Sequence, residues 1–143
     1  MMTYAPRSRA ARTAGAYASV GLESEVLGAT PERLISLLFR GALTATAQAR
    51  LHMGNGRTAE RGQSISKAID IVETGLKASV DPERGGDVAR HLIAAYELIV
   101  RNLLQANLNN DPSKLESAEK LLSDLADAWH VAADPQFERP PAP

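Results

Sequence analysis

The chain has 143 residues, no cysteine, and a formal net charge of -1 from 16 basic and 17 acidic residues. This length fits one domain, and the absence of cysteine excludes disulfides, thiolate metal sites and cysteine nucleophiles. The balanced charge gives no reason to expect nucleic acid as a partner, and an aromatic content of 4% argues against a β-sandwich core. No apolar run of about 18 residues is present, so we expect a cytoplasmic protein without membrane insertion or a secretory signal.

The two ends of the chain differ in composition from the middle. Residues 1–14 are small, polar and basic, and we expect them to form a disordered, solvated tail. Residues 134–143 are rich in proline and are expected to form a second disordered tail. The expected domain spans residues 15–133. Its first part, 16–27, is semi-apolar without long periodicity, and we expect it to lie as a strap on the rest of the domain.

Two helices are predicted in the first half of the domain. Thr30 is a good N-cap and Pro31 fits the first helical position, so the first helix is expected over residues 31–52, before Gly54-Asn55-Gly56. The second helix is expected from about residue 58 to 78 or 79, with charged residues opposite an apolar seam. That seam consists of Ile65, Ala68, Ile69, Val72 and Leu76.

The stretch 87–108 contains no glycine or proline and is predicted to form an uninterrupted central helix, after a loop over residues 81–86. Its apolar residues form two adjoining rows. The first row is Val88, Leu92, Ala95, Ile99, Leu103 and Ala106. The second row is Ile93, Tyr96, Val100, Leu104 and Leu108. A stripe this wide packs against at least two neighbours, or against one neighbour and a ligand.

A last helix is predicted to start at Asp111-Pro112 and to end before Asp134-Pro135. Its apolar seam alternates spacings of three and four residues, as in a left-handed bundle. The seam consists of Leu115, Ala118, Leu122, Leu125, Trp129 and Ala132. Short loops make antiparallel neighbours the expected topology, so the predicted fold is all-α, an antiparallel up-and-down four-helix bundle with an N-terminal capping segment.

The sequence contains no pattern typical of an enzyme or a cofactor protein. His52, His91 and His130 are far apart, and none belongs to a metal-binding motif such as His-Glu-x-x-His. No glycine-rich phosphate loop or nucleophile elbow is present. We therefore expect no catalytic residue, cofactor or metal. One alternative is a histidine phosphotransfer bundle in a signalling relay, with His91 as the candidate, although the usual His-x-x-Lys-Gly pattern is missing after it.

Several short segments together resemble one known family. They are Ala16-Tyr17-Ala18-x-Val20, Leu37-Leu38-Phe39-x-Gly41-Ala42, Ser66-Lys67-Ala68-Ile69-x-Ile71, Gly75-Leu76-Lys77-Ala78, Gly85-Gly86, Leu103-Leu104-Gln105-Ala106-Asn107-Leu108-x-Asn110-Asp111 and Ala126-Asp127-Ala128-Trp129. In this order and at this spacing they resemble the flagellin-specific export chaperones of bacteria, the flagellar secretion chaperone (FliS) family. The resemblance covers about residues 14 to 131.

The resemblance implies a cytoplasmic helical bundle that binds the disordered C-terminal segment of flagellin. Such a chaperone prevents premature polymerisation of flagellin and assists its delivery to the flagellar type III export apparatus. Regulators of flagellin synthesis or of flagellar gene expression are further candidate partners. In family members the flagellin segment folds into short helices in hydrophobic grooves, and the chaperone's own N-terminal segment can cap one groove. The residues expected to bind flagellin are Tyr17, Leu22, Leu38, Ile65, Ile69, Val72, Tyr96, Val100, Leu104 and Leu108.

Overall fold

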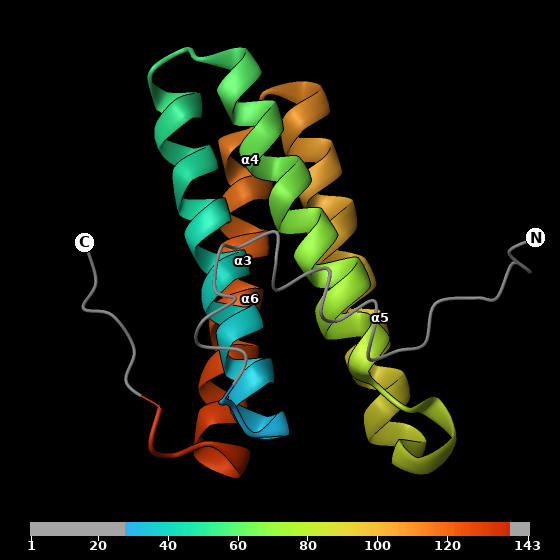
Figure 1. Cartoon of the computed structure of the whole chain (residues 1–143). Helices are drawn as coiled ribbons and strands as arrows, with labels where there is room; N and C mark the ends of the chain where they lie inside the picture. The colour runs from blue at the N-terminus through green and yellow to red at the C-terminus, as the bar shows by residue number, and fades with distance from the viewer. Residues whose placement is uncertain (1–27, 138–143) are drawn as a thin grey trace, which may run out of the picture.

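A computed structural model describes residues 28–137 of the chain. In this part the helices are α3 (Pro31–Gly54), α4 (Thr58–Asp70), the π-helix η1 (Ile71–Leu76), the 3₁₀-helix η2 (Lys77–Ser79), α5 (Pro82–Asn109) and α6 (Pro112–Ala133). Residues 28–137 contain no strand. The helices run alternately up and down the bundle (Figure 1). The predicted all-α four-helix bundle is therefore confirmed, while the expected capping segment lies outside the described residues.

Three of the helices begin in the same way, with a capping side chain followed by proline. Thr30 Oγ1 accepts a hydrogen bond of 3.1 Å from the backbone N–H of Arg33. Asp111 Oδ1 accepts one of 2.9 Å from the backbone N–H of Ser113. Each cap satisfies a backbone donor that the helix itself leaves unpaired, and the proline after it has no N–H to satisfy. The starts predicted for the first and last helices are thus confirmed.

The central helix begins earlier than the sequence predicted. Asp81 Oδ1 accepts from the backbone N–H of Glu83 at 3.0 Å, and residues 82–85 form a helical turn instead of the expected loop. A kink at Gly86 (φ 57°, ψ -135°) separates this turn from the rest of α5. Only glycine adopts this backbone conformation readily. The expectation of a loop over residues 81–86 was wrong because the Asp-Pro start extends the helix to the glycine that bends it.

The second predicted helix occupies the expected residues but changes geometry along its length. After α4 the chain continues as η1 and η2. Thr74 Oγ1 donates to the carbonyl of Asp70 at 2.7 Å, and Ser79 Oγ donates to the carbonyl of Gly75 at 2.6 Å. Hydroxyls that bond the carbonyl four residues earlier compete with the backbone ladder and bend helices. They accompany the π and 3₁₀ turns at the end of this helix.

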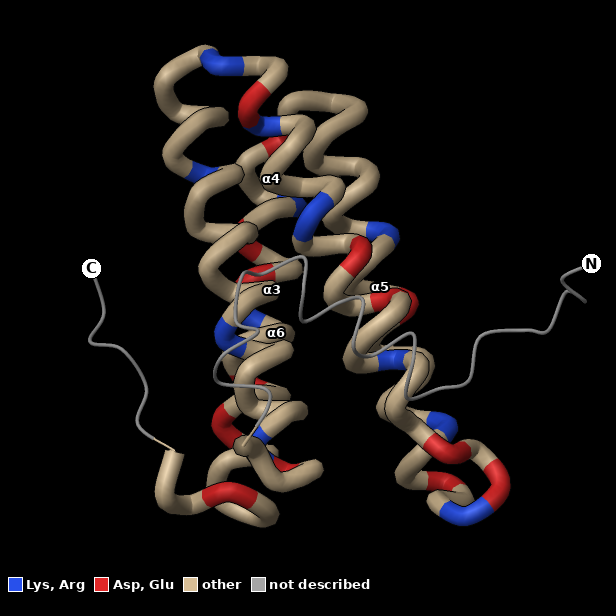
Figure 2. Tube along the Cα trace, in the orientation of Figure 1, with Lys and Arg blue, Asp and Glu red and all other residues tan. Residues whose placement is uncertain are grey.

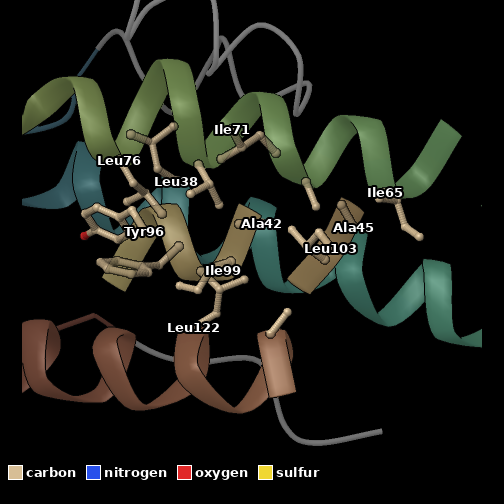
Figure 3. Close-up of a cluster of buried hydrophobic side chains, with 14 of the residues drawn as sticks. Leu38, Ala42, Ala45, Ile65, Ile71, Leu76, Tyr96, Ile99, Leu103 and Leu122 are labelled. Carbon is tan, nitrogen blue, oxygen red and sulfur yellow. The ribbon is translucent and has the colours of Figure 1, made fainter. Parts of the chain in front are cut away.

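The core lies along the axis between the helices (Figure 3). Helix α3 packs against α4, η1 and α6, and α5 packs against α6, α4 and η1. The largest fully buried side chains are Phe39, Leu37, Leu38, Ile65, Ile71, Leu76, Ile99, Leu103, Leu115, Leu122 and Val72. All four long helices contribute to this set, so each seam predicted from the sequence reaches the common core.

Polar side chains tie pairs of helices together at the rim of the core. Arg61 on α4 donates from Nη2 to the carbonyl of Asn107 at 3.1 Å and from Nη1 to Oδ1 of Asn110 at 2.6 Å. Arg50 on α3 pairs with Glu119 on α6. These contacts fix the relative position of neighbouring helices, because a guanidinium donates in directions set by its planar shape.

Candidate functional site

The two apolar rows of α5 differ in burial. Of the first row, Ile99, Leu103 and Ala106 are fully buried. The second row is buried only at Tyr96; Leu104 is 55% exposed and Leu108 is 82% exposed. The predicted stripe is therefore wider than the bundle covers. Its second row passes from the core to the surface towards the C-terminal end of α5.

Val100, Leu104 and Leu108 form what we call the exposed strip of α5. They follow one another at intervals of four residues, which places them on one face of the helix. Val100 is half-buried and packs on the core, while the two leucines project into solvent. Large apolar side chains gathered on one helical face are a typical feature of surfaces that bind a partner.

Helix α4 and its continuation border this strip. Arg61 Nε lies 3.2 Å from Oδ1 of Asn107, and Lys77 Nζ lies 3.4 Å from Oε1 of Glu97. Glu97 and Asn107 lie seven residues before and three residues after Leu104, on the same side of α5. The strip is thus an apolar surface along the junction of α4 and α5.

The flank of α4 that contacts α5 near Asn107 includes two small residues. A Cβ atom added to Gly62 would lie 3.9 Å from the side chain of Asn107, so this glycine sits directly against α5. Ser66 and Ile69 follow at intervals of four and three residues on the same flank of α4. Gly62 and Ser66 add little side-chain volume to this flank of α4, and Ile69 is half-buried there.

The residues expected to bind flagellin are divided by the structure into three groups. Leu38, Ile65, Val72 and Tyr96 are buried in the core and offer no surface to a partner in this conformation. Ile69 and Val100 are half-buried at the rim, and Leu104 and Leu108 are exposed. Tyr17 and Leu22 lie outside the described residues. Within residues 28–137, the exposed strip and Ile69 are therefore the members of the expected set that a partner can reach.

A charged cluster of Glu73, Lys77 and Glu97 lies at one end of the strip and was not predicted from the sequence. Lys77 Nζ lies 3.6 Å from Oε2 of Glu73 and 3.4 Å from Oε1 of Glu97, so one cation is shared by two carboxylates from different helices. The spacing of Glu73 and Lys77 predicts their pairing along one helix. The third member could not be found in this way, because it belongs to α5.

Several other apolar side chains are exposed away from the strip. Leu98, on another flank of α5, is 42% exposed. Leu98 belongs to neither apolar row and is not among the residues expected from the sequence to bind flagellin. In the part of the chain that the structure describes, the remaining large exposed hydrophobic residues are Leu51, Val131 and Val88, the first member of the first row.

Tyr96 marks the point where the second row enters the core. Its ring centroid lies 6.4 Å from that of Phe39 on α3, in a tilted arrangement typical of aromatic pairs. Burial raises the pKa of the Tyr96 phenol above its ordinary value of 10.0, because the charged form is poorly solvated there. This tyrosine is a packing residue that supports the exposed strip from within.

The described residues show no arrangement that suggests catalysis. Across residues 28–137, no group of three or more histidine, aspartate and glutamate residues could hold a metal ion. His91, the candidate for phosphotransfer, is exposed on α5. No helix in the described part of the chain is long and apolar enough to span a bilayer. The exposed strip on this helical bundle is the type of apolar surface on which proteins bind a partner helix.

Comparisons with known proteins identify the family. The family described as "Flagellar protein FliS" matches residues 13–136. The flagellar secretion chaperone FliS of Salmonella typhimurium is 47% identical over 114 residues, which are 80% of this chain and 84% of that protein. That of Escherichia coli is 45% identical over 120 residues, 84% of this chain and 88% of that protein. FliSB of Pseudomonas aeruginosa is 41% identical over 113 residues, 79% and 89% of the two chains. The chain belongs to the FliS family of flagellar secretion chaperones, which is a non-enzymatic family.

Proposed function

We propose that this protein is a cytoplasmic export chaperone that binds the disordered C-terminal segment of flagellin. Through that binding it prevents premature polymerisation and assists delivery of flagellin to the flagellar type III export apparatus. The observation that carries the proposal is the exposure of Leu104 and Leu108 beside Leu103 and Ala106 of the first row, which are fully buried. Membership of a family of flagellar secretion chaperones supports the identity of the cargo.

The physical basis is the hydrophobic surface that remains open after the bundle has formed. Burial of apolar surface contributes about 25 cal/mol for each Å² removed from water. A disordered segment gains this free energy when it folds as an amphipathic helix against the strip, and part of that gain offsets the entropy lost on ordering. A partner without fixed structure is therefore well suited to this surface, because it can adapt its shape to the junction of α4 and α5.

Charge distribution is consistent with a protein partner. Basic and acidic residues are interspersed over residues 28–137, without a large region of one sign (Figure 2). The balanced net charge of -1 gives no reason for long-range attraction to nucleic acid. Affinity for the cargo then depends on apolar contacts, with charged groups such as Glu73, Lys77 and Glu97 at the edge of the surface.

Two further parts of the proposal extend beyond the described residues. The segment 15–27, with Tyr17 and Leu22, caps a groove when flagellin is absent. Regulators of flagellin synthesis or of flagellar gene expression are additional partners. Both rest on the resemblance to family members. The phosphotransfer alternative has weaker support, because His91 belongs to no relay motif and the chain belongs to a chaperone family.

A co-purification experiment tests the proposal. Tagged protein should retain full-length flagellin from the same organism and lose it when the C-terminal segment of flagellin is removed. Incubation with a small-molecule phosphodonor should leave His91 unmodified. Equal retention of both forms of flagellin, or retention of neither, contradicts the proposed cargo site.

A further inference from the structure

The end of α6 folds back onto the start of α3 and forms a polar cluster that we call the clasp. It consists of Arg33, Ser36, Trp129, Asp134 and Phe137. The start of α3 and the end of α6 lie side by side at one end of the bundle (Figure 1). From its sequence position, Asp134 is expected to belong to the proline-rich C-terminal tail, residues 134–143. In the structure this residue is 7% exposed and helps hold the chain against α3.

The carboxylate of Asp134 is the centre of the clasp. It accepts a hydrogen bond of 2.7 Å from the hydroxyl of Ser36, and Arg33 approaches it with Nη2 at 3.1 Å and Nε at 2.9 Å. The indole N–H of Trp129 donates to Ser36 Oγ at 3.1 Å. Ser36 Oγ and Trp129 Nε1 also lie within hydrogen-bond distance of the backbone carbonyl of Glu32, at 3.3 and 3.2 Å. Asp134 is therefore the group that connects Ser36 to Arg33, and its loss would separate these two side chains.

An aromatic ring closes the outer side of the clasp. Phe137 lies under two guanidinium groups, 5.0 Å from that of Arg33 and 5.2 Å from that of Arg40. It also stacks on the ring of His130 at a centroid distance of 4.8 Å. Both guanidiniums carry a permanent charge, and Asp134 supplies a compensating negative charge. The clasp therefore depends on an ionised carboxylate.

The surroundings of Asp134 favour the ionised carboxylate that the clasp requires. Burial raises the pKa of its carboxyl, but the hydrogen bonds from Ser36 and Arg33 and the nearby positive charges outweigh that effect and hold the pKa below its ordinary value of 3.8. The group is consequently charged at neutral pH.

We propose that the clasp is a conformational device that opens on its own, releasing residues 129–137 from α3 while the rest of the bundle stays folded. Trp129 and Phe137 are only partly buried at the rim of the core, whereas Leu122 and Ala126 hold α6 from fully buried positions. Hydrogen bonds and ion pairs to one carboxylate hold this end, and the two aromatic rings beside it are only partly buried. Segments of this kind open at lower free energy than the core.

Opening the clasp would expose the rings of Trp129 and Phe137 at the end of the bundle where α3 begins and α6 ends. The described chain begins at Gly28, three residues before α3, and ends at Phe137. Both ends of the described chain therefore lie near the clasp, and opening it changes the exposed apolar surface at this end of the bundle.

Trp129 makes the device directly observable, because it is the only tryptophan of the chain. Its fluorescence reports on the clasp, while far-ultraviolet circular dichroism reports on the helices. In urea, the full-length protein should lose the fluorescence signal of the closed clasp at a lower concentration than it loses helicity. Asp134→Asn should move the fluorescence transition to lower urea and increase quenching by acrylamide, with the dichroism midpoint almost unchanged.

Asp124→Asn is the matched control, since Asp124 is an exposed residue of the same helix that pairs with Lys120 at 3.1 Å. It should shift neither transition appreciably. Ser36→Ala provides a second disruption if Asp134→Asn does not fold, and the wild-type comparison needs no variant. Coincident fluorescence and dichroism transitions in the wild type, or an equal shift of both in the clasp variants, would show that the end of α6 unfolds with the core and would overturn the proposal.

Discussion

Leu103 and Leu104 are neighbours in sequence, of the same residue type and on the same helix, yet their surroundings are opposite. Leu103 is fully buried between the helices, whereas Leu104 is 55% exposed along the junction of α4 and α5. The first residue belongs to the row that holds the bundle together, and the second to the row that we propose as the cargo surface. The comparison shows that apolar character alone does not tell whether a helical position serves stability or binding.

The largest expected effect is the difference in the free energy of unfolding between the Leu103→Ala and Leu104→Ala variants. Leu103→Ala should lower the free energy of unfolding by about 2 to 5 kcal/mol, because it leaves a cavity in a core that is fully closed there. Leu104→Ala removes a side chain that already contacts water, and it should change the free energy of unfolding far less. Urea denaturation of both variants, followed by circular dichroism, measures the difference. Equal losses would mean that both rows are core.

A second prediction concerns residues 15–27, which we propose to cap a flagellin-binding groove when flagellin is absent. If residues 15–27 cap the groove, removal of residues 1–22 should lower the free energy of unfolding by about 1 to 3 kcal/mol, the amount expected for one docked tyrosine. Affinity for flagellin should stay unchanged or rise, since a cap reduces the fraction of molecules with an open groove. Thermal denaturation and titration of the truncated protein test both parts. Unchanged stability combined with lost binding would place the segment in the cargo site.

The smallest expected effect is an alkaline loss of stability at Tyr96, the member of the second row that lies in the core. Because burial raises the pKa of Tyr96 above 10.0, the unfolded chain releases this proton at a lower pH than the folded protein. Stability from this group is complete below pH 10 and falls as the pH rises above it, by at most about 1.4 kcal/mol per pH unit. Urea titrations at pH 9 to 11 should show this slope in the wild type.

Tyr96→Phe removes the titrating group while keeping the ring beside Phe39. The variant should therefore lose stability less steeply with rising pH than the wild type. The same slope in both proteins would show that the phenol of Tyr96 is not protected by the fold. Such a result would mean that Tyr96 is exposed to solvent, like Leu104 and Leu108, and is not part of the core.

The sequence contained most of the information about the fold. Thr30 and Asp111, each before a proline, predicted helix starts because capping depends on side chains that act on their own helix. Apolar periodicity predicted the seams for the same local reason. The kink at Gly86 was missed as a helical feature because two glycines are equally compatible with a loop.

The candidate site was less accessible to sequence reasoning. The second row was recognisable in the sequence as a surplus of apolar residues. Which of them are buried, such as Tyr96, and which are exposed, such as Leu104, depends on how the other helices pack against α5. Gly62 of α4 is one such neighbour, and its contact with α5 joins positions 45 residues apart, at Gly62 and Asn107. The clasp around Asp134 likewise joins residues separated by 98 positions. Periodicity within one helix contains no information about such pairs.

The most direct test of the account is a calorimetric titration of the C-terminal flagellin peptide into three forms of the chaperone: wild type, Leu104→Ala and Leu98→Ala. Leu98 is the matched control, because it is a partly exposed leucine on another flank of the same helix. The wild type should bind one peptide with a negative heat-capacity change, as expected for coupled folding that buries about 1,000 to 3,000 Å².

Leu104→Ala should weaken the binding by about tenfold or more, which corresponds to a loss of about 1.4 kcal/mol, while Leu98→Ala should bind like the wild type. This pattern would place the cargo on the exposed strip of α5. Absence of wild-type binding at micromolar concentrations, or equal weakening by both substitutions, would contradict the assignment of the second row to flagellin.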